Sequence, residues 1–234
     1  MVATGFPNNG QCQVIDMSSS TTTCSNLPSY PTSVYGAAGG VINGSPIICG
    51  GNSGSPRSLR NLQGSCYIFD KNENTWKLHC NMKSRRVQPA ISVVKGTLFV
   101  SGGGGDGDDL TSTEIIYSNG TVESGPHFPG KRHGHCMVTL PDGKVMIIGA
   151  ASPNPINRNA VIIDPANTNN SYTDVPSTNY IRKRAACALF NSPLHDGRPV
   201  VLVAGGDSTT TAEVYDYTVA DQWQTSIHLI MSNM

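Results

Sequence analysis

The stretch LFVSGGGGDGDDL, residues 98–110, sets an apolar run directly before four consecutive glycines and a group of aspartates. Taken alone, it suggests a phosphate loop or a cation site. A dinucleotide-binding loop requires a helix to begin right after the glycines, whereas DGDDLTSTEIIYSNG leads into another strand. Asp106, Asp108 and Asp109 carry oxygen atoms of the kind that Ca²⁺ accepts, but we interpret them as a solvated loop between strands.

The apolar run that ends in glycine recurs along the chain, and this recurrence decides the fold. Its four copies are PIICGG (46–51), LFVSGG (98–103), VMIIGA (145–150) and VLVAGG (201–206). An apolar stretch precedes each copy, and a β-rich run follows it: CYIFD, EIIYS, AVIID or AEVYD. A shorter strand then closes the unit, marked by Trp76 in NTWKL and by Trp223 in DQWQT. Turn dipeptides such as NG, KG and DG separate the strands.

Four short strands in a unit of about fifty residues are typical of a β-propeller blade. One such sheet cannot bury both faces alone, so it must stack on its neighbours. We predict an all-β propeller with a half blade at 1–34 followed by four blades at 35–84, 85–130, 131–181 and 182–234. The C-terminal end supplies no strands to complete the half blade. We therefore expect an incomplete ring of about four and a half four-stranded blades.

Several repeated residues carry a family resemblance. They are the diglycines Gly50-Gly51, Gly102-Gly103 and Gly205-Gly206, the strand-ending Asp70, Asp164 and Asp216, and the two tryptophans. On these residues the chain resembles the kelch-repeat family of β-propellers, which is related to the central domain of galactose oxidase. The third copy departs with Gly149-Ala150, and the second and third lack the tryptophan. Kelch rings contain more blades than are counted here, so the resemblance implies a fragment of a larger propeller.

Composition excludes two classes of partner. Charged residues make up 14% of the chain and the formal net charge is zero. Without a Lys/Arg-rich block there is no electrostatic footprint for nucleic acid or an anionic membrane surface. No apolar stretch approaches the roughly 18 residues of a membrane helix. We therefore expect neither nucleic-acid binding nor membrane insertion.

Four of the seven cysteines vary together between units. Cys12 and Cys66 begin third strands, and Cys24 and Cys80 fall in the fourth strands that follow. Facing residues on antiparallel strands lie within disulfide reach. We predict the disulfides Cys12–Cys24 and Cys66–Cys80, and hence an extracellular or secreted protein; four buried thiols are the alternative.

The other three cysteines, Cys49, Cys136 and Cys187, fall in apolar first and second strands. We expect them to be core residues rather than reactive thiols. No C-x-x-C pair is present, so neither a thiol redox site nor a zinc site is indicated.

An arginine enters the first strand of three successive blades, at Arg86, Arg132 and Arg184. Equivalent positions of a propeller lie on one face around the axis. Three guanidinium groups there would bind carboxylates through paired hydrogen bonds. The alternative is that each arginine pairs with an acidic side chain or a carbonyl of its own blade.

Catalytic signals are weak. His133 and His135 lie two apart on an inner strand, as a pair of metal ligands would, but no third ligand is identified, and we expect them to bond the backbone. The copper ligands of galactose oxidase match no motif here, so we predict no metal and no cofactor. The prediction is a non-enzymatic kelch-repeat module that binds a protein or an acidic ligand on one face, within a larger secreted or ectodomain protein. A fragment of a galactose-oxidase-like or sugar-modifying enzyme, and a purely structural repeat array, are the alternatives.

Overall fold

The computed structural model describes residues 2–3, 10–15, 24–54, 59–152, 155–167, 169–207, 209–219 and 222–226. The described strands form five antiparallel sheets in chain order. The first sheet has three strands: β1 (Val2–Ala3), β2 (Cys12–Ile15) and β3 (Cys24–Leu27). Three short 3-10 helices, Leu59–Asn61, Ile156–Arg158 and Pro193–His195, lie in loops between strands.

The other four sheets have four strands each and are named blades 1 to 4. Blade 1 is β4 (Ala38–Ile42), β5 (Ser45–Cys49), β6 (Ser65–Asp70) and β7 (Thr75–Asn81). Blade 2 is β8 (Ala90–Val94), β9 (Thr97–Ser101), β10 (Thr113–Ile116) and β11 (Val122–Ser124). Blade 3 is β12 (Cys136–Thr139), β13 (Val145–Ile148), β14 (Ala160–Ile163) and β15 (Tyr172–Val175). Blade 4 is β16 (Ala186–Asn191), β17 (Pro199–Ala204), β18 (Ala212–Tyr215) and β19 (Gln224–Ser226).

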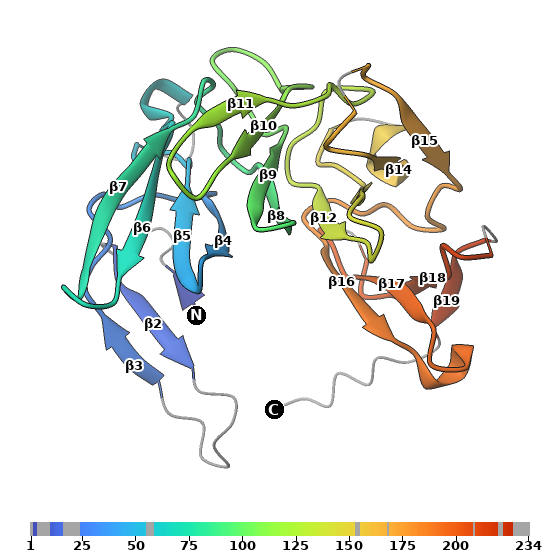
Figure 1. The fold of residues 1–234 in the computed structure, drawn as a ribbon. Helices are drawn as coiled ribbons and strands as arrows, with labels where there is room; N and C mark the ends of the chain where they lie inside the picture. Colours follow the sequence, from blue (N-terminus) through green and yellow to red (C-terminus); the bar gives the residue numbers. More distant parts are fainter. Residues whose placement is uncertain are drawn as a thin grey trace.

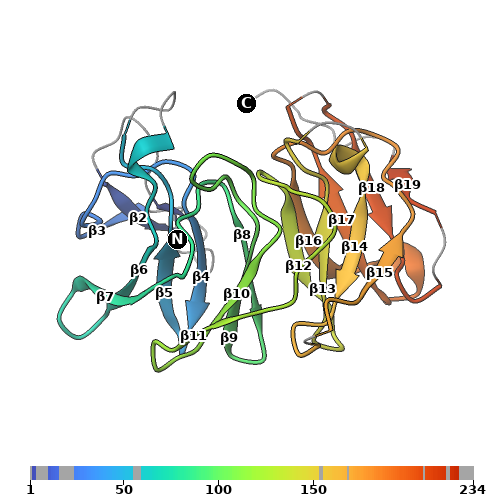
Figure 2. The same ribbon diagram turned by 90° about the horizontal axis from the view of Figure 1, so that it is seen from above.

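The sheets stand in an arc around one axis. Figure 1 shows the first sheet at one end of the arc and blade 4 at the other. The first strand of each blade, β4, β8, β12 or β16, lies innermost and contacts the first strand of the next blade. Seen from above in Figure 2, the blades stand side by side. The predicted all-β propeller with four four-stranded blades is confirmed; no described strand of the first sheet pairs with blade 4.

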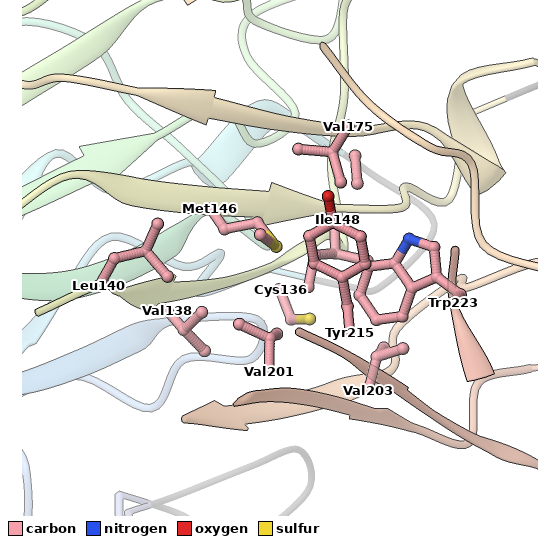
Figure 3. Close-up of a cluster of buried hydrophobic side chains, with 11 residues drawn as sticks. Cys136, Val138, Leu140, Met146, Ile148, Val175, Val201, Val203, Tyr215 and Trp223 are labelled. Carbon is pink, nitrogen blue, oxygen red and sulfur yellow. The ribbon is translucent and has the colours of Figure 1, made fainter. Parts of the chain in front are cut away.

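The hydrophobic core is divided among the interfaces between sheets. One apolar cluster lies between the first sheet and blade 1, and three more lie between successive blades. In the last of these, between blades 3 and 4, Tyr215 stacks on Trp223 with ring centroids 5.1 Å apart (Figure 3). A blade therefore has no complete core of its own and depends on its neighbours for burial.

The repeated tryptophans also join neighbouring sheets. The Trp76 indole N–H donates to the carbonyl of Pro28, in the loop after the first sheet, at 3.0 Å. The Trp223 indole N–H donates to the carbonyl of Pro176, just after blade 3, at 2.7 Å. Each ring thus buries its apolar surface and satisfies its one polar atom.

The diglycines are structural. Gly102 and Gly103 have φ angles of 55° and 97°, in the region that favours glycine. A Cβ on Gly102 would lie 2.5 Å from the carbonyl oxygen of Arg132 in the next blade, and the Gly103 N–H donates to that oxygen at 3.0 Å. The Gly51 N–H donates to the Arg86 carbonyl at 2.7 Å in the same way. The glycines therefore let the backbones of adjacent blades touch, and the glycine-rich stretch 98–110 forms a contact between blades.

The disulfides differ from those predicted. Cys49 and Cys66 are bonded across β5 and β6, with Cα atoms 4.1 Å apart. The predicted Cys66–Cys80 bond is therefore wrong. Cys80 lies directly opposite Cys66 on β7 as a buried thiol. Cys66 thus has a cysteine on both sides, and the structure pairs it with the strand that precedes it.

A second disulfide joins Cys136 on β12 to Cys187 on β16 and links blade 3 to blade 4. Cys49 and Cys136 lie in the core, as expected, and Cys187 packs against it, but all three are bonded in disulfides that the sequence analysis did not predict. Cys12 is buried, but the side chain of Cys24 lies outside the described residues. The backbone register places Cys12 opposite Leu27 and Cys24 opposite Ile15. The Cys12–Cys24 bond stays a prediction.

Within the described part of the chain, no helix is long and apolar enough to cross a membrane.

Candidate functional site

A chain of backbone hydrogen bonds links the four blades beside the axis. The Gln88 N–H donates to the Gly36 carbonyl at 2.6 Å, the Gly134 N–H to the Gln88 carbonyl at 3.0 Å, and the Arg184 N–H to the Gly134 carbonyl at 2.8 Å. All four residues have φ between 53° and 63°. They occupy the same place in each blade, just before the innermost strand. The side chains of Gln88 and Arg184, the two members of this series that are not glycine, therefore both start from positions beside the axis.

Glycine alternates with a residue that has a long polar side chain along this chain of hydrogen bonds. A Cβ on Gly36 would lie 3.0 Å from Gln88 Cγ. A Cβ on Gly134 would lie 3.1 Å from Arg184 Cγ and 3.6 Å from Gln88 Oε1. The two glycines thus leave room for Gln88 and Arg184 to approach each other over Gly134. We call Gln88, His133, Arg184, Asp109 and Asp207 the axial mouth.

Arg184 carries the exposed positive charge of the axial mouth. Its Nη1 lies 2.5 Å from Asp207 Oδ2, and the side chains are 49% and 39% exposed. An ion pair this exposed contributes little to stability. The guanidinium can therefore exchange Asp207 for an incoming carboxylate at small cost.

Two aspartates of the loop 106–109 contact cationic or polar partners. Asp109 Oδ2 lies 2.7 Å from His133 Nδ1 and accepts a hydrogen bond from the Ser152 hydroxyl at 2.9 Å. Asp108 forms an ion pair with Lys131, while Asp106 is exposed. Among the described residues, no three His, Cys, Asp or Glu side chains are grouped as metal ligands.

The two histidines singled out in the sequence do not converge. His133 faces Asp109, whereas the His135 ring is buried between blades 2 and 3, with Nε2 2.7 Å from the Ser101 hydroxyl. Burial lowers the pKa of His135 well below its usual value, and the positive charges of Arg132, His133 and Arg86 lower it further. His135 is therefore a neutral packing residue.

The predicted row of three arginines on one exposed face is not formed, because two of its members are buried. Arg86 and Arg132 are 0% exposed and cannot present a guanidinium to a partner on the surface. The buried equivalent in blade 4 is Arg182, also 0% exposed, because Arg184 shares its backbone position with Gln88 and Gly134. Of the three predicted ligand-binding residues, the structure leaves only Arg184 at the surface.

Two of the buried arginines have a carboxylate within their own blade. Arg86 Nη2 lies 2.8 Å from Glu114 Oε1, and Arg182 Nη2 lies 2.5 Å from Glu213 Oε2. Each arginine also donates to the carbonyl of the first glycine of its blade's diglycine, Gly102 or Gly205. The alternative interpretation, pairing within the blade, is therefore correct for blades 2 and 4.

The run Arg182-Lys183-Arg184 explains the error. Spacing from the diglycine varies between units because blade 4 has a longer turn before β17, so spacing alone cannot choose between the two arginines. The glutamate in the third strand, present in TEIIY and AEVYD, indicates a blade in which a buried arginine has a carboxylate partner. The position four residues before the first strand, shared with Arg86 and Arg132, identifies that arginine in blade 4 as Arg182.

The arc of antiparallel sheets around one axis defines the class of this protein as a β-propeller. The chain is similar to the solved structure titled "Structure of YjhT", with a TM-score of 0.78 and 13% sequence identity over 94% of this chain and 78% of that one. At this identity the likeness shows the fold alone. No protein-family model matches the chain, and a comparison with curated proteins finds no match.

Proposed function

We propose that this protein is a non-enzymatic, kelch-type binding module that takes an acidic protein segment or another carboxylate-bearing ligand at the axial mouth. The single observation that carries the proposal is the chain of backbone hydrogen bonds that sets Gln88, Gly134 and Arg184 at the same position of three successive blades, with His133 next to Gly134. Side chains from separate rigid sheets, held by short backbone contacts, form a preorganised surface.

The chemistry of the ligand follows from the exposed guanidinium. Arginine binds carboxylates through paired, charge-assisted hydrogen bonds. Gln88 offers a neutral donor and acceptor beside it. A glutamate- or aspartate-containing segment therefore suits the axial mouth better than a basic or purely apolar one.

The two disulfides support an extracellular or secreted location, because such bonds persist in oxidising compartments. We further propose that the chain acts as part of a larger secreted or ectodomain protein.

The test is a titration with a labelled acidic peptide, followed by fluorescence anisotropy. Arg184→Gln should weaken binding by about tenfold, as expected for the loss of a hydrogen bond to a charged group. Glutamine suits the substitution because Gln88 occupies the same backbone conformation in blade 2. Binding to the parent protein should also weaken as salt rises, since screening acts over about 10 Å at 0.1 M ionic strength.

Arg198→Gln is the matched control. Arg198 pairs with Asp216, is 41% exposed, and lies at the opposite end of β17 from Asp207. Equal weakening by both substitutions would mean nonspecific charge attraction and would overturn the axial mouth as the site. Oxidation of a sugar by the copper-supplemented protein would instead support the enzyme interpretation.

A further inference from the structure

Blade 3 breaks the rule of the buried arginines. Arg86 and Arg182 each face a glutamate, but Arg132, equally buried, has no carboxylate partner among the described residues. The register shows why. Glu114 lies opposite Val100 and Glu213 opposite Val203, two residues before the first glycine; in blade 3 this place is taken by Val161, opposite Ile147.

The glutamates of blades 2 and 4 do more than pair with arginine. Glu114 accepts the backbone N–H groups of Lys83 and Ser84 at 2.6 and 3.0 Å. Glu213 accepts those of Asn179 and Tyr180 at 2.6 and 3.4 Å. In both blades these residues lie three and two positions before the buried arginine. The fold thus forms a carboxylate-binding cradle from one guanidinium and two backbone N–H groups.

In blade 3 the same positions border a pocket of about 180 Å³. Pro129 and Gly130, three and two residues before Arg132, line it together with Arg132 and Asn159. Proline has no N–H, so Gly130 keeps the one backbone donor of the pair. Pockets for drug-sized ligands usually measure about 300 to 1,000 Å³, so this pocket suits a small molecule.

The Arg132 guanidinium is only partly satisfied. Its Nη2 donates to the Pro129 carbonyl at 2.9 Å and to Asn159 Oδ1 at 2.8 Å, while Nε has no hydrogen-bond partner. Burial lowers the pKa of Arg132 to about 10, because no neighbouring carboxylate offsets the loss of solvation. A buried cation without a counter-ion is costly, so an anion that reaches it is bound with a gain in stability.

We propose that the pocket beside Arg132 binds a small carboxylate ligand, whose oxygens take the place that the Glu114 and Glu213 carboxylates hold in blades 2 and 4. Arg132 and the Gly130 N–H are the donors. The site shares no residue with the axial mouth, so the test of this site is independent of the function proposed above.

Asp174 is an acidic residue of this chain that lines the same pocket. It lies directly opposite Val161 on β15, where blades 2 and 4 have Ser124 and Thr225. Its side chain is exposed and lines the pocket without forming an ion pair with Arg132. A carboxylate at the entrance repels an incoming anion, so Asp174 weakens binding and favours a ligand that is small enough to pass it.

The test compares thermal unfolding in sodium formate or acetate with unfolding in sodium chloride at equal ionic strength. Ligand binding to the folded state raises the midpoint, and we expect a rise of about 2 to 4 °C for a site near saturation. Val161→Glu should abolish this response and raise the midpoint in chloride, because it gives blade 3 the internal carboxylate that Glu114 and Glu213 supply in blades 2 and 4.

Asp174→Asn should shift the formate response to several-fold lower concentration. Asp142→Asn, which removes a carboxylate on a surface turn beside Lys144, is the control for general charge effects and should not. Equal midpoints in formate and chloride for the parent protein would overturn the proposal, as would a response that survives Val161→Glu. A lowered midpoint for Asp174→Asn in chloride, without tighter formate binding, would show that Asp174 neutralises Arg132 and would also overturn it.

Discussion

Glu114 accepts hydrogen bonds from one side chain and two backbone groups in the interior of blade 2. Its carboxylate joins Arg86 to two backbone N–H groups at a place with 2% exposure. Removing one member of a buried pair leaves the other charge without compensation, which costs about 3 to 5 kcal/mol. We therefore expect Glu114→Gln to lower the free energy of unfolding by an amount in this range, measured by urea denaturation.

Glu123→Gln on the adjacent strand is the control, because Glu123 is exposed and bonds only the Tyr117 hydroxyl among the described contacts. It should change stability by less than about 0.5 kcal/mol. The double variant Arg86→Met/Glu114→Leu removes both charges and should recover part of the loss. If Glu114→Gln proved as stable as the parent protein, the buried pair would not support the blade.

His135 gives the protein a specific acid sensitivity. Its pKa is lowered by burial and by nearby positive charge, so the unfolded chain takes up a proton near pH 6.5 that the folded protein does not. Above about pH 6.5, His135 does not affect the free energy of unfolding. As the pH decreases through that value, the free energy of unfolding should fall by up to about 1.4 kcal/mol per pH unit. Urea unfolding between pH 7 and 5.5 measures the slope.

His135→Gln should flatten that slope, since glutamine keeps a polar atom near Ser101 without titrating. The carboxylates with lowered pKa, among them Asp70 and Asp216, contribute in the same direction only at lower pH, near and below about 4. An unchanged slope in the variant would mean that another group takes up the proton.

At the scale of the strand, blade 1 sets three cysteines side by side. Cys49, Cys66 and Cys80 lie opposite one another on β5, β6 and β7, and only the first two are bonded. Burial raises the pKa of the Cys80 thiol to about 11. Because the thiolate is the reactive form, Cys80 should react with iodoacetamide at pH 8 roughly a hundredfold more slowly in the folded protein than after unfolding.

Mass spectrometry of protein from an oxidising compartment checks both parts of this prediction. It should find Cys49 linked to Cys66 and Cys136 linked to Cys187, with Cys80 labelled only after denaturation. Cys80→Ala should leave both links in place. A Cys66–Cys80 link, or rapid labelling of Cys80 in the folded state, would contradict it.

The elements were predictable where the repeat constrains them locally. A diglycine after an apolar run indicates the end of a second strand, because only glycine tolerates both the positive φ and the close approach of the next blade. What failed were relations between neighbouring units and pairings that depend on the register within a blade. Cys136 and Cys187 belong to different blades, and the pairing of Arg182 with Glu213 depends on register. Of the axial mouth, Arg184, His133 and Asp109 were singled out separately, but their grouping was not foreseen, since a chain of backbone hydrogen bonds leaves no side-chain motif.

At the scale of the whole molecule, the outer face of blade 4 exposes apolar side chains of its first strand. On β16, Cys187 and Leu189 pack toward blade 3, while Ala186, Ala188 and Phe190 point the other way and are exposed. In blades 1 to 3 the next blade covers this side. Figure 1 shows blade 4 at the end of the arc.

An exposed apolar sheet face of this kind favours association. We expect residues 1–234, prepared alone, to self-associate at micromolar concentration, as measured by sedimentation velocity. Phe190→Lys should shift the population toward monomer, because it replaces the largest apolar side chain of this face with a charge. It should leave the unfolding midpoint nearly unchanged, since Phe190 is already 40% exposed. Leu194→Lys is the matched control: Leu194 is 92% exposed but lies in the turn after β16, outside the sheet face. Association that persists in Phe190→Lys, or that Leu194→Lys disrupts equally, would show that the chains meet through another surface.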